Sequence, residues 1–180
     1  MQAVEFAILD WIQAHLRCAF LDFFLPLVTS LSNNGEVWIV LALVLLLFRR
    51  RRRQGLSVAT ALLLDLVSCN LFLKPLIGRV RPCVVNPAVE LLLAVPGDAS
   101  FPSGHTAVSF AAVSALYFSK SPLWKPAAVL ACVIAFSRLY LYVHWPSDVL
   151  GGIVLGVAVG WAGAKLAALG AKRLENRKKA

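Results

Sequence analysis

The sequence is poor in acidic residues and in charge generally. Its 180 residues include 9 Asp and Glu against 18 Lys and Arg, and charged residues make up 15% of the chain while hydrophobic residues make up 59%. Soluble domains are usually about half apolar and about a quarter charged, so this composition excludes an ordinary soluble domain. The net charge of +9 is compatible with nucleic acid, but the basic residues cluster between apolar runs, as they do beside membrane helices. We predict a single integral membrane domain with the lipid bilayer, and not nucleic acid, as its partner.

Cysteine is scarce too, and its spacing excludes two kinds of small scaffold. Cys18, Cys69, Cys83 and Cys132 form no Cys-x-x-Cys pair, so neither a zinc site nor a disulfide framework is expected. No cluster of carboxylates, Cys or His has the spacing of metal ligands, and the sequence predicts no metal and no other cofactor. The chain opens without a basic segment, apolar core and cleavage site, so no cleaved signal peptide is expected.

The apolar runs indicate an all-α, polytopic membrane bundle. About five of them are expected to cross the bilayer, at residues 36–48, 55–73, 106–118, 126–143 and 147–168. Residues 4–16 have apolar side chains at helical spacing, which favours an amphipathic helix on the membrane surface. Residues 19–31 are apolar but short and are interrupted by Asp22 and Pro26. We expect a second interfacial or re-entrant piece there, with a sixth crossing left open.

The last apolar run carries a series of glycines. Gly152, Gly156 and Gly160 recur every four residues, and Gly163 follows. Small residues at this spacing let helix backbones approach closely inside a membrane, so we expect tight packing against a neighbouring helix. A lipid-facing helix that tolerates glycine is the alternative.

The distribution of charge orients the predicted bundle. Five alternating spans place the arginine run 49–53, Lys120, Lys125 and the C-terminal tail on one side, which the positive-inside rule makes cytoplasmic. Residues 74–105 and 144–147 then lie on the extracytoplasmic side of the cell (plasma or inner) membrane. We divide the chain into an interfacial N-terminal segment (1–32), a transmembrane catalytic bundle (36–169) and a basic cytoplasmic tail (170–180).

Three stretches at helix ends are predicted to meet on the extracytoplasmic side. They contribute, in chain order, Lys74 and Arg81; Ser103, Gly104 and His105; and Arg138, His144 and Asp148. Three cations held close together are costly unless an anion neutralises them, and guanidinium groups suit phosphate oxygens. The first amides of a helix that begins at 103–105 add donors for the same anion.

The two histidines supply a nucleophile and an acid for such a site. Asp148 can accept the Nδ1–H of one of them and leave its Nε2 free to attack. Pro146 is expected to keep the residues before it out of a helix, which places His144 in a turn and Asp148 in the first turn of the last helix. Because metal ligands are absent from the pattern, we expect a metal-free phosphoryl transfer.

The three stretches resemble the signature of the type-2 phosphatidic acid phosphatase superfamily, which also includes vanadium haloperoxidases. The pattern Lys-x6-Arg-Pro, Pro-Ser-Gly-His and Ser-Arg-x5-His-x3-Asp is matched throughout, over residues 74–148. The resemblance implies that His144 forms a phosphohistidine with Asp148 as its partner, and that His105 protonates the leaving group. It also implies the phosphate-binding residues Lys74, Arg81, Ser103, Gly104 and Arg138.

Within this superfamily the chain is most similar to small bacterial undecaprenyl-diphosphatases. It is short, has an amphipathic N-terminal segment and contains the run Asp98-Ala-Ser-Phe-Pro-Ser-Gly-His. The resemblance implies hydrolysis of undecaprenyl diphosphate, which recycles the carrier lipid of cell-wall synthesis. Phosphatidylglycerophosphate and phosphatidic acid are alternative substrates, because phosphate-binding residues do not read the lipid tail. A haloperoxidase and a non-enzymatic lipid-binding or transport protein are more remote alternatives.

Several residues keep two interpretations. Ser103 can simply cap its helix, and Arg79 is expected to be a membrane flank rather than a ligand. Asp65 lies in the middle of a span, where a charge suggests function, although a protonated helix–helix hydrogen bond is equally open. Aromatic belts at a membrane interface are expected to contain Trp11, Trp38, Trp124 and Trp145. Trp145 is also a candidate to line the site of the lipid headgroup.

Overall fold

The computed structural model describes residues 2–177, with side chains over 2–173. All regular elements of these residues are helical, which confirms the predicted all-α class. The long helices are α1 (Gln2–Leu16), α2 (Ala19–Ser30), α3 (Glu36–Leu47), α4 (Arg52–Asp65), α7 (Gly104–Phe118), α8 (Trp124–Tyr140) and α9 (Pro146–Arg177). The short ones are the 3-10 helix η1 (Arg49–Arg51), the π-wound η2 (Leu66–Leu73), α5 (Lys74–Ile77) and α6 (Pro82–Val85).

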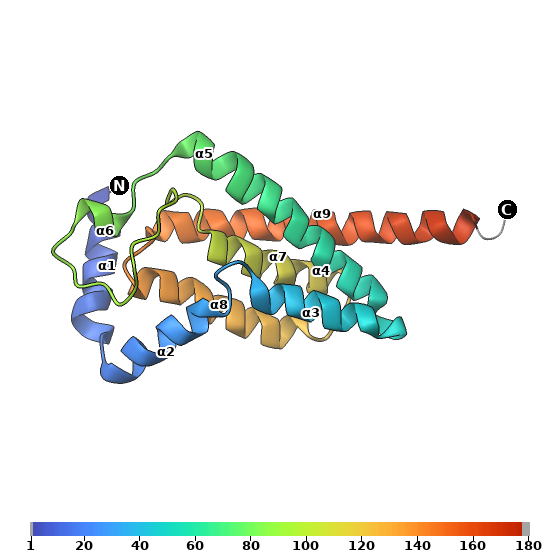
Figure 1. The fold of residues 1–180 in the computed structure, drawn as a ribbon, viewed down its shortest axis with the longest axis horizontal. Coiled ribbons are helices and arrows are strands. Elements are labelled where there is room, and N and C mark those ends of the chain that lie inside the picture. The colour runs from blue at the N-terminus through green and yellow to red at the C-terminus, as the bar shows by residue number, and fades with distance from the viewer. Residues whose placement is uncertain (1, 178–180) are drawn as a thin grey trace.

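The bundle consists of α3, α4, α7, α8 and α9 (Figure 1). α3, α7, α8 and α9 run along the long axis of the molecule, and α4 crosses them obliquely on its way to α5. α7 packs against α9, α8 and α4, and α4 also packs against α3 and α9. α1, α2 and the loop before α7 gather at one end of this bundle, where α1 contacts α8 and α9. The helix ends that carry the three motifs lie together at the end covered by α1.

One continuous helix, from α4 through η2 to α5, leads to the first motif. Its π-wound part precedes Pro75, which has no N–H to donate and whose ring clashes with a carbonyl in regular α winding. The N–H of Lys74 accordingly bonds to the carbonyl of Cys69, five residues back. The helix ends at Gly78, whose φ of 58° is left-handed and suits glycine. From this turn the chain runs back over the end of the bundle.

The glycines of α9 let it lie directly against α7, as predicted. An added Cβ at Gly156 would lie 2.5 Å from the carbonyl oxygen of Ala107, a distance that leaves no room for a side chain. At the start of both helices, the N–H of Ser103 donates to the carbonyl of Asp148 at 3.1 Å. This close packing fixes the second motif against the third.

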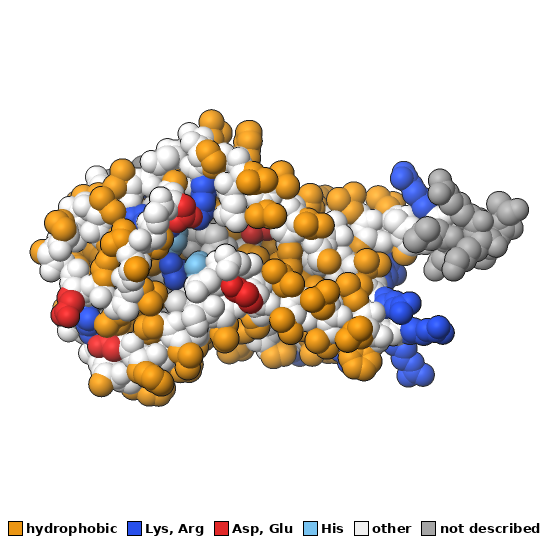
Figure 2. Space-filling model, viewed as in Figure 1, with side chains coloured by type: hydrophobic (Ala, Val, Ile, Leu, Met, Phe, Trp, Pro, Cys, Tyr) orange, Lys and Arg blue, Asp and Glu red, His pale blue; other side chains and the backbone are white. Residues whose placement is uncertain are grey.

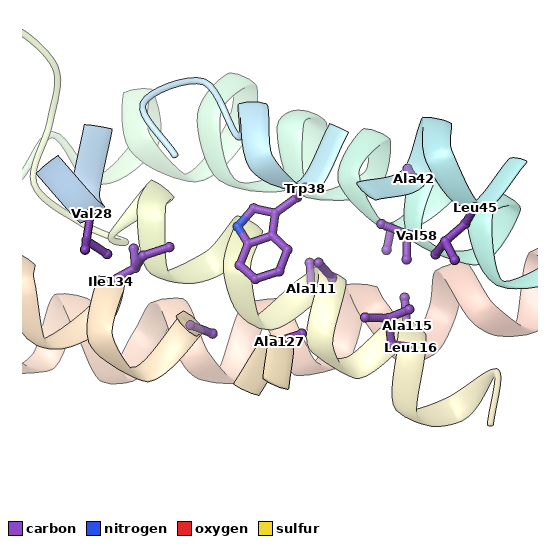
Figure 3. Packing of buried hydrophobic residues seen from close by; sticks show 13 residues of the cluster. Val28, Trp38, Ala42, Leu45, Val58, Ala111, Ala115, Leu116, Ala127 and Ile134 are labelled. Carbon is purple, nitrogen blue, oxygen red and sulfur yellow. The ribbon is translucent and has the colours of Figure 1, made fainter. Parts of the chain in front are cut away.

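Trp38 of α3 lies in an apolar cluster formed with α4, α7 and α8 (Figure 3). It is 1% exposed, and its indole N–H donates to the hydroxyl of Ser109 on α7 at 3.0 Å. Trp145 is also 1% exposed, in a second cluster against α1, and its indole N–H donates to the carbonyl of Val80 at 2.9 Å. The prediction that these two tryptophans belong to interfacial belts is therefore wrong, because both indoles are buried with internal acceptors.

Two helical stretches, Arg49–Val85 and Pro146–Arg173, are long and apolar enough to cross a bilayer. α3, α7 and α8 have 12, 15 and 17 residues, fewer than the roughly 20 that a single crossing needs. The number of five crossings and the interfacial position of α1 and α2 stay predictions. Figure 2 shows Lys and Arg side chains at the end of the molecule opposite α1, where the arginine run 49–53 is exposed. Residues 178–180 of the predicted tail lie outside the described residues, and α9 extends into the rest of it.

Candidate active site

The three predicted stretches surround one cavity of about 970 Å³. Its lining includes six of the eight predicted site residues: Lys74, Arg81, Gly104, His105, Arg138 and His144. Figure 2 shows basic, acidic and histidine side chains gathered at a hollow in this face of the molecule. The other two predicted residues, Ser103 and Asp148, are fully buried and do not line the cavity.

His144 lies in the turn between α8 and α9. α9 begins at Pro146, so His144 is outside the helix and Asp148 is in its first turn, as predicted. The Nδ1 of His144 lies 3.4 Å from Asp148 Oδ2, and its Nε2 lies 3.1 Å from Arg81 Nη1. Because arginine only donates, Nε2 is the acceptor and the ring proton is on Nδ1, facing Asp148. This tautomer carries the Nε2 lone pair that a nucleophilic histidine needs.

Asp148 is itself held by three donors. Its Oδ2 accepts from the N–H of Trp145 at 2.9 Å and from the hydroxyl of Ser100, and its Oδ1 accepts from Arg79 Nη1 at 2.6 Å. These donors compensate the burial of a carboxylate. They also fix the direction in which it faces His144, as outer partners do for a functional histidine.

Arg79 belongs to this network, so the prediction that it is a membrane flank is wrong. Its guanidinium bridges Asp148 and, at 2.7 Å, the carboxylate of Glu5 on α1. Glu5 also accepts from the hydroxyl of Ser147 at 2.6 Å. Burial alone would raise the pKa of Glu5, but the hydrogen bonds from Ser147 and Arg79 hold it below its ordinary value. α1 is therefore tied to the residues that orient His144.

The three predicted phosphate-binding cations approach the cavity from different helix ends. Arg138 is 3% exposed and donates through Nη1 to the hydroxyl of Thr29 on α2 at 2.7 Å. Its Nε has no hydrogen-bond partner among the described residues. Lys74 and Arg81 both pair with Asp98, the latter through Nη2 at 2.7 Å. A buried N–H without an acceptor, such as that of Arg138 Nε, is uncommon, and an anion in the cavity would supply the acceptor.

Gly104 and His105 form the facing wall, in the first turn of α7. An added Cβ at Gly104 would lie 3.4 Å from both Lys74 Nζ and Asn70 Oδ1, so the glycine backbone lies beside the cation. The Nε2 of His105 lies 3.2 Å from Asn33 Oδ1, in the turn between α2 and α3. With that amide oxygen as acceptor, Nε2 carries a proton that His105 can donate.

The side chain of Ser103 does not cap the helix that it precedes. Ser103 precedes the first residue of α7, but its side chain makes no capping hydrogen bond, so the simple capping interpretation is wrong. Its hydroxyl accepts instead from Thr106 Oγ1 at 2.9 Å. Contact between Ser103 and phosphate stays a prediction.

The cavity continues from the cations into an apolar groove between α3 and the α4–η2 helix. The groove is lined by Ile39, Leu43, Leu46, Leu62 and Leu66. Asp65 also lines it, is 2% exposed, and has no partner for its Oδ1 among the described residues, so that oxygen makes no helix–helix hydrogen bond. Trp145, a candidate for the headgroup site, is not part of this lining. A ligand with an anionic head and an apolar chain fits such a cavity.

Both histidines are held neutral by their surroundings. Burial, with the charges of Arg138 and Arg81, lowers the pKa of His144 to about 3, although the hydrogen bond to Asp148 acts in the opposite direction. Burial and the charge of Arg138 lower the pKa of His105 to about 2. The neutral form of His144 is the one that the predicted role of nucleophile requires. His105 can act as an acid only when a negatively charged group beside it raises its pKa.

Sequence reasoning missed five residues of this site: Glu5, Thr29, Asn33, Asp98 and Ser100. Asn33 stands in the Asn33-Asn34-Gly35 run that signals a turn, and Asp98 begins the run quoted for the resemblance. Ser100 lies in the same run, whereas Glu5 and Thr29 carry no local signal. Each contacts a motif residue only because α1, α2 and the loop before α7 fold over the end of the bundle.

Residues 53–169 match the PAP2 superfamily. An undecaprenyl-diphosphatase of Sulfolobus acidocaldarius is 34% identical over 159 residues, covering 86% of this chain and 76% of that protein. A decaprenylphosphoryl-5-phosphoribose phosphatase of Mycobacterium tuberculosis is 36% identical over 134 residues, covering 73% of each chain. Among solved structures, a transmembrane phosphatidylglycerolphosphate phosphatase from Bacillus subtilis has the same fold, with a TM-score of 0.75 at 24% identity over 92% of this chain and 85% of that chain.

Proposed function

Because the chain belongs to the PAP2 superfamily and is a membrane lipid phosphatase of that family, we propose that it hydrolyses undecaprenyl diphosphate to undecaprenyl phosphate through a phosphohistidine at His144. The relative from Sulfolobus acidocaldarius supports this choice of lipid. Phosphatidylglycerophosphate and phosphatidic acid are the alternative substrates, because the relatives are named for several lipid phosphates.

In the first step, the Nε2 lone pair of His144 attacks the terminal phosphorus. A nitrogen–phosphorus bond forms while the bond from phosphorus to the leaving oxygen breaks. Asp148 holds the Nδ1 proton as positive charge develops on the ring. The bound anionic phosphate raises the pKa of His105, so that His105 takes up a second ring proton when the substrate binds. This imidazolium donates one proton to the leaving oxygen, which departs as undecaprenyl phosphate, and His105 is left neutral.

In the second step, His105 takes a proton from a water molecule whose oxygen attacks the same phosphorus. The nitrogen–phosphorus bond breaks, inorganic phosphate is released, and both histidines return to their starting forms. Throughout, Lys74, Arg81 and Arg138 meet the charge of the phosphate oxygens. Three cations line the cavity beside His144, and no three His, Cys, Asp or Glu side chains in the described part of the chain are placed to hold a metal ion together. We therefore expect turnover without added metal.

The observation that carries the proposal is the continuity of the cavity. Three cations lie at one end of it and the apolar groove between α3 and α4 lies at the other. A phosphate bound at Nε2 of His144 would leave its lipid chain in the groove. A haloperoxidase or a phosphatase of soluble substrates needs no such groove.

The direct test is phosphate release by the purified protein in detergent. We would offer undecaprenyl diphosphate, phosphatidylglycerophosphate and phosphatidic acid, each with and without a chelator. We expect the highest kcat/KM with undecaprenyl diphosphate and no loss of rate in chelator. A higher kcat/KM with either glycerolipid would replace the proposed substrate, and a rate that returns only with magnesium would contradict the metal-free mechanism.

The site is further proposed to face the extracytoplasmic side, with the C-terminus in the cytoplasm. The positive-inside rule supports this orientation, because the exposed arginine run 49–53 lies at the end opposite the cavity. Single cysteines placed at residue 53 and in the loop 86–99 can be labelled with a membrane-impermeant reagent in intact cells. Labelling at 53 but not in the loop would invert the topology.

A further inference from the structure

Asp98 lies between two of the cations that are predicted to bind phosphate. Its carboxylate pairs with the ammonium of Lys74 and, at 2.7 Å, with Nη2 of Arg81. All three side chains line the cavity that His144 lines. The carboxylate is thus an anion of the protein bound to phosphate-binding groups.

The surroundings of the three side chains differ in a way that lets Asp98 leave. The side chain of Asp98 is 52% exposed, against 11% for Lys74 and 4% for Arg81. Arg81 keeps other acceptors without it, because Nη1 donates to the carbonyl of Val143 at 2.7 Å and Nε to the backbone carbonyl of Asp98 at 3.0 Å. Asp98 also stands in the loop between α6 and α7 rather than in a helix. Arg81 therefore stays anchored when this carboxylate rotates away.

The cations keep Asp98 ionised. Burial acts to raise its pKa, but the hydrogen bond and charge of Lys74 and the charge of Arg81 lower it to about 2. A ligand must therefore displace a full negative charge from these two groups. A terminal phosphate carries about 1.5 to 2 negative charges and three acceptor oxygens. A phosphodiester headgroup carries one charge and has two of its oxygens esterified.

We propose that Asp98 is a specificity-determining residue that admits terminal phosphate groups and excludes the phosphodiester headgroups of ordinary membrane lipids. This inference rests on the proposed function, because it assumes that the cavity receives a lipid through its apolar groove. The surrounding bilayer presents phosphodiesters to that groove at a concentration far above that of any substrate. A terminal phosphate gains enough charge-assisted hydrogen bonds to displace the carboxylate, whereas a phosphodiester exchanges one single charge for another and gains little. The selectivity then comes from the Asp98 carboxylate, which competes with the lipid headgroup for Lys74 and Arg81.

The alternative is that Asp98 positions Lys74 and Arg81. This role predicts the opposite change in phosphate binding when Asp98 is replaced. If Asp98 only held the cations in place, its loss would weaken phosphate binding and lower kcat. If Asp98 competes for the cations, its loss strengthens the binding of every phosphate, including the phosphodiesters that it normally excludes. The sign of the change separates the two roles.

The test compares Asp98→Asn and Asp98→Ser with Glu90→Gln, which removes one charge from an exposed residue of the same loop. Phosphatidylglycerol is added to mixed micelles as an inhibitor of phosphate release from the lipid that the wild type turns over best. Its inhibition constant is expected to fall about tenfold in both Asp98 variants, as the loss of one charge-assisted competitor would give, and to stay at the wild-type value in Glu90→Gln and in Asp98→Glu. An unchanged or weaker inhibition in the Asp98 variants would overturn the proposal.

A second measurement does not depend on turnover. Binding of inorganic phosphate and of phosphatidylglycerol to the same four variants and the wild type is followed by calorimetry in detergent. Tighter binding of both in Asp98→Asn supports the proposal, and weaker binding contradicts it. If the wild type releases phosphate from none of the lipids, the proposed function fails while this measurement still reports whether Asp98 competes for the cations.

Discussion

The two histidines of the site have opposite surroundings, although both line the same cavity. His144 is 1% exposed, and its two ring nitrogens face Asp148 and Arg81. Behind it, hydrogen bonds and ion pairs continue through Arg79 to Glu5 on α1. The ring of His105 has one hydrogen bond within the described residues, to Asn33 in the turn between α2 and α3, and His105 lines the cavity together with the residues of the apolar groove.

The difference fits the roles proposed for the two histidines, nucleophile for His144 and acid for His105. A nucleophile has to meet the phosphorus in one orientation, so a rigid network that sets its tautomer raises the rate. An acid has to follow the leaving oxygen, which belongs to the lipid and lies on the groove side. The protein therefore fixes one histidine and leaves the other adjustable, and substitutions on the two walls are expected to differ in size and in substrate dependence.

Replacement of the nucleophile has the largest expected effect. His144→Ala removes the attacking nitrogen and leaves the phosphate-binding cations in place, so kcat is expected to fall by about 10⁴-fold or more. The measurement is phosphate release together with acid-quench trapping of a ³²P-labelled phosphoenzyme. A trapped phosphohistidine in His144→Ala would show that another residue is the nucleophile.

Replacement of the acid is expected to depend on the substrate. His105→Ala should lower kcat/KM by roughly 10² to 10³-fold for phosphatidic acid, whose leaving group is a poor alkoxide that needs a proton. The loss should be smaller for undecaprenyl diphosphate, because its leaving group is a phosphate. Rates with both lipids check this, and equal losses would count against the role of acid.

The neutral state of His144 makes stability depend on pH. Its folded pKa of about 3 lies below the ordinary value of 6.5, so below pH 6.5 the unfolded chain takes up a proton that the folded chain does not. The contribution of His144 to stability is therefore expected to fall as the pH falls, by about 2.7 kcal/mol at most between pH 6.5 and 4.5. His105, whose pKa is also lowered, adds a loss of its own over the same range. The thermal midpoint in detergent at both pH values measures this, with His144→Gln as the variant that lacks the group. A variant as sensitive to acid as the wild type would contradict the origin of the effect.

The same comparison shows what the sequence could predict. The residues that do the chemistry lie at helix ends marked by short motifs, and the structure places six of them on one cavity. The residues that hold these side chains in place are not part of such motifs. Glu5, Asn33 and Asp98 lie in a terminal helix and two loops, and their partners are set by how those segments fold over the bundle. No local pattern encodes that contact.

Helix identity was predicted from apolar periodicity, but side-chain surroundings were not. The glycines of α9 were predicted to lie against a neighbour because small residues have few other uses at that spacing. Trp38 and Trp145 were assigned to interfacial belts on a statistical preference, and both are buried with acceptors for their indole N–H groups. The sequence places Arg79 at a membrane flank, because the residues beside it in the chain do not indicate that Glu5 and Asp148 are its partners.

The hydrogen-bond network that orients His144 can be weakened without replacing His144 itself. Arg79→Met removes the donor to Oδ1 of Asp148 and the ion pair with Glu5, so Asp148 loses part of its orientation. We expect kcat to fall about tenfold with little change in KM, and Arg79→Lys to recover part of the loss. Arg17→Met, which breaks an ion pair with Asp22 instead, is the control and should retain full activity. A rise in KM at constant kcat would make Arg79 a substrate ligand rather than a positioning residue.

Removing the hydrogen-bond partner of His105 is expected to lower the rate less than removing Arg79, and it is the smallest effect that we predict. Asn33→Ala removes the only side-chain hydrogen bond of His105 in the described structure, which is worth about 1 kcal/mol or roughly fivefold in rate for a neutral pair. Asn34→Ala is the matched control, because the Asn34 amide donates to Glu36 and not to a histidine. The loss in Asn33→Ala should be greater with phosphatidic acid than with undecaprenyl diphosphate, as for His105→Ala, since both act on the same proton. If Asn33→Ala instead lowered the rate as much as Arg79→Met, and equally with both lipids, that result would show that His105 is held as rigidly as His144. The different surroundings of the two histidines would then not account for their proposed roles.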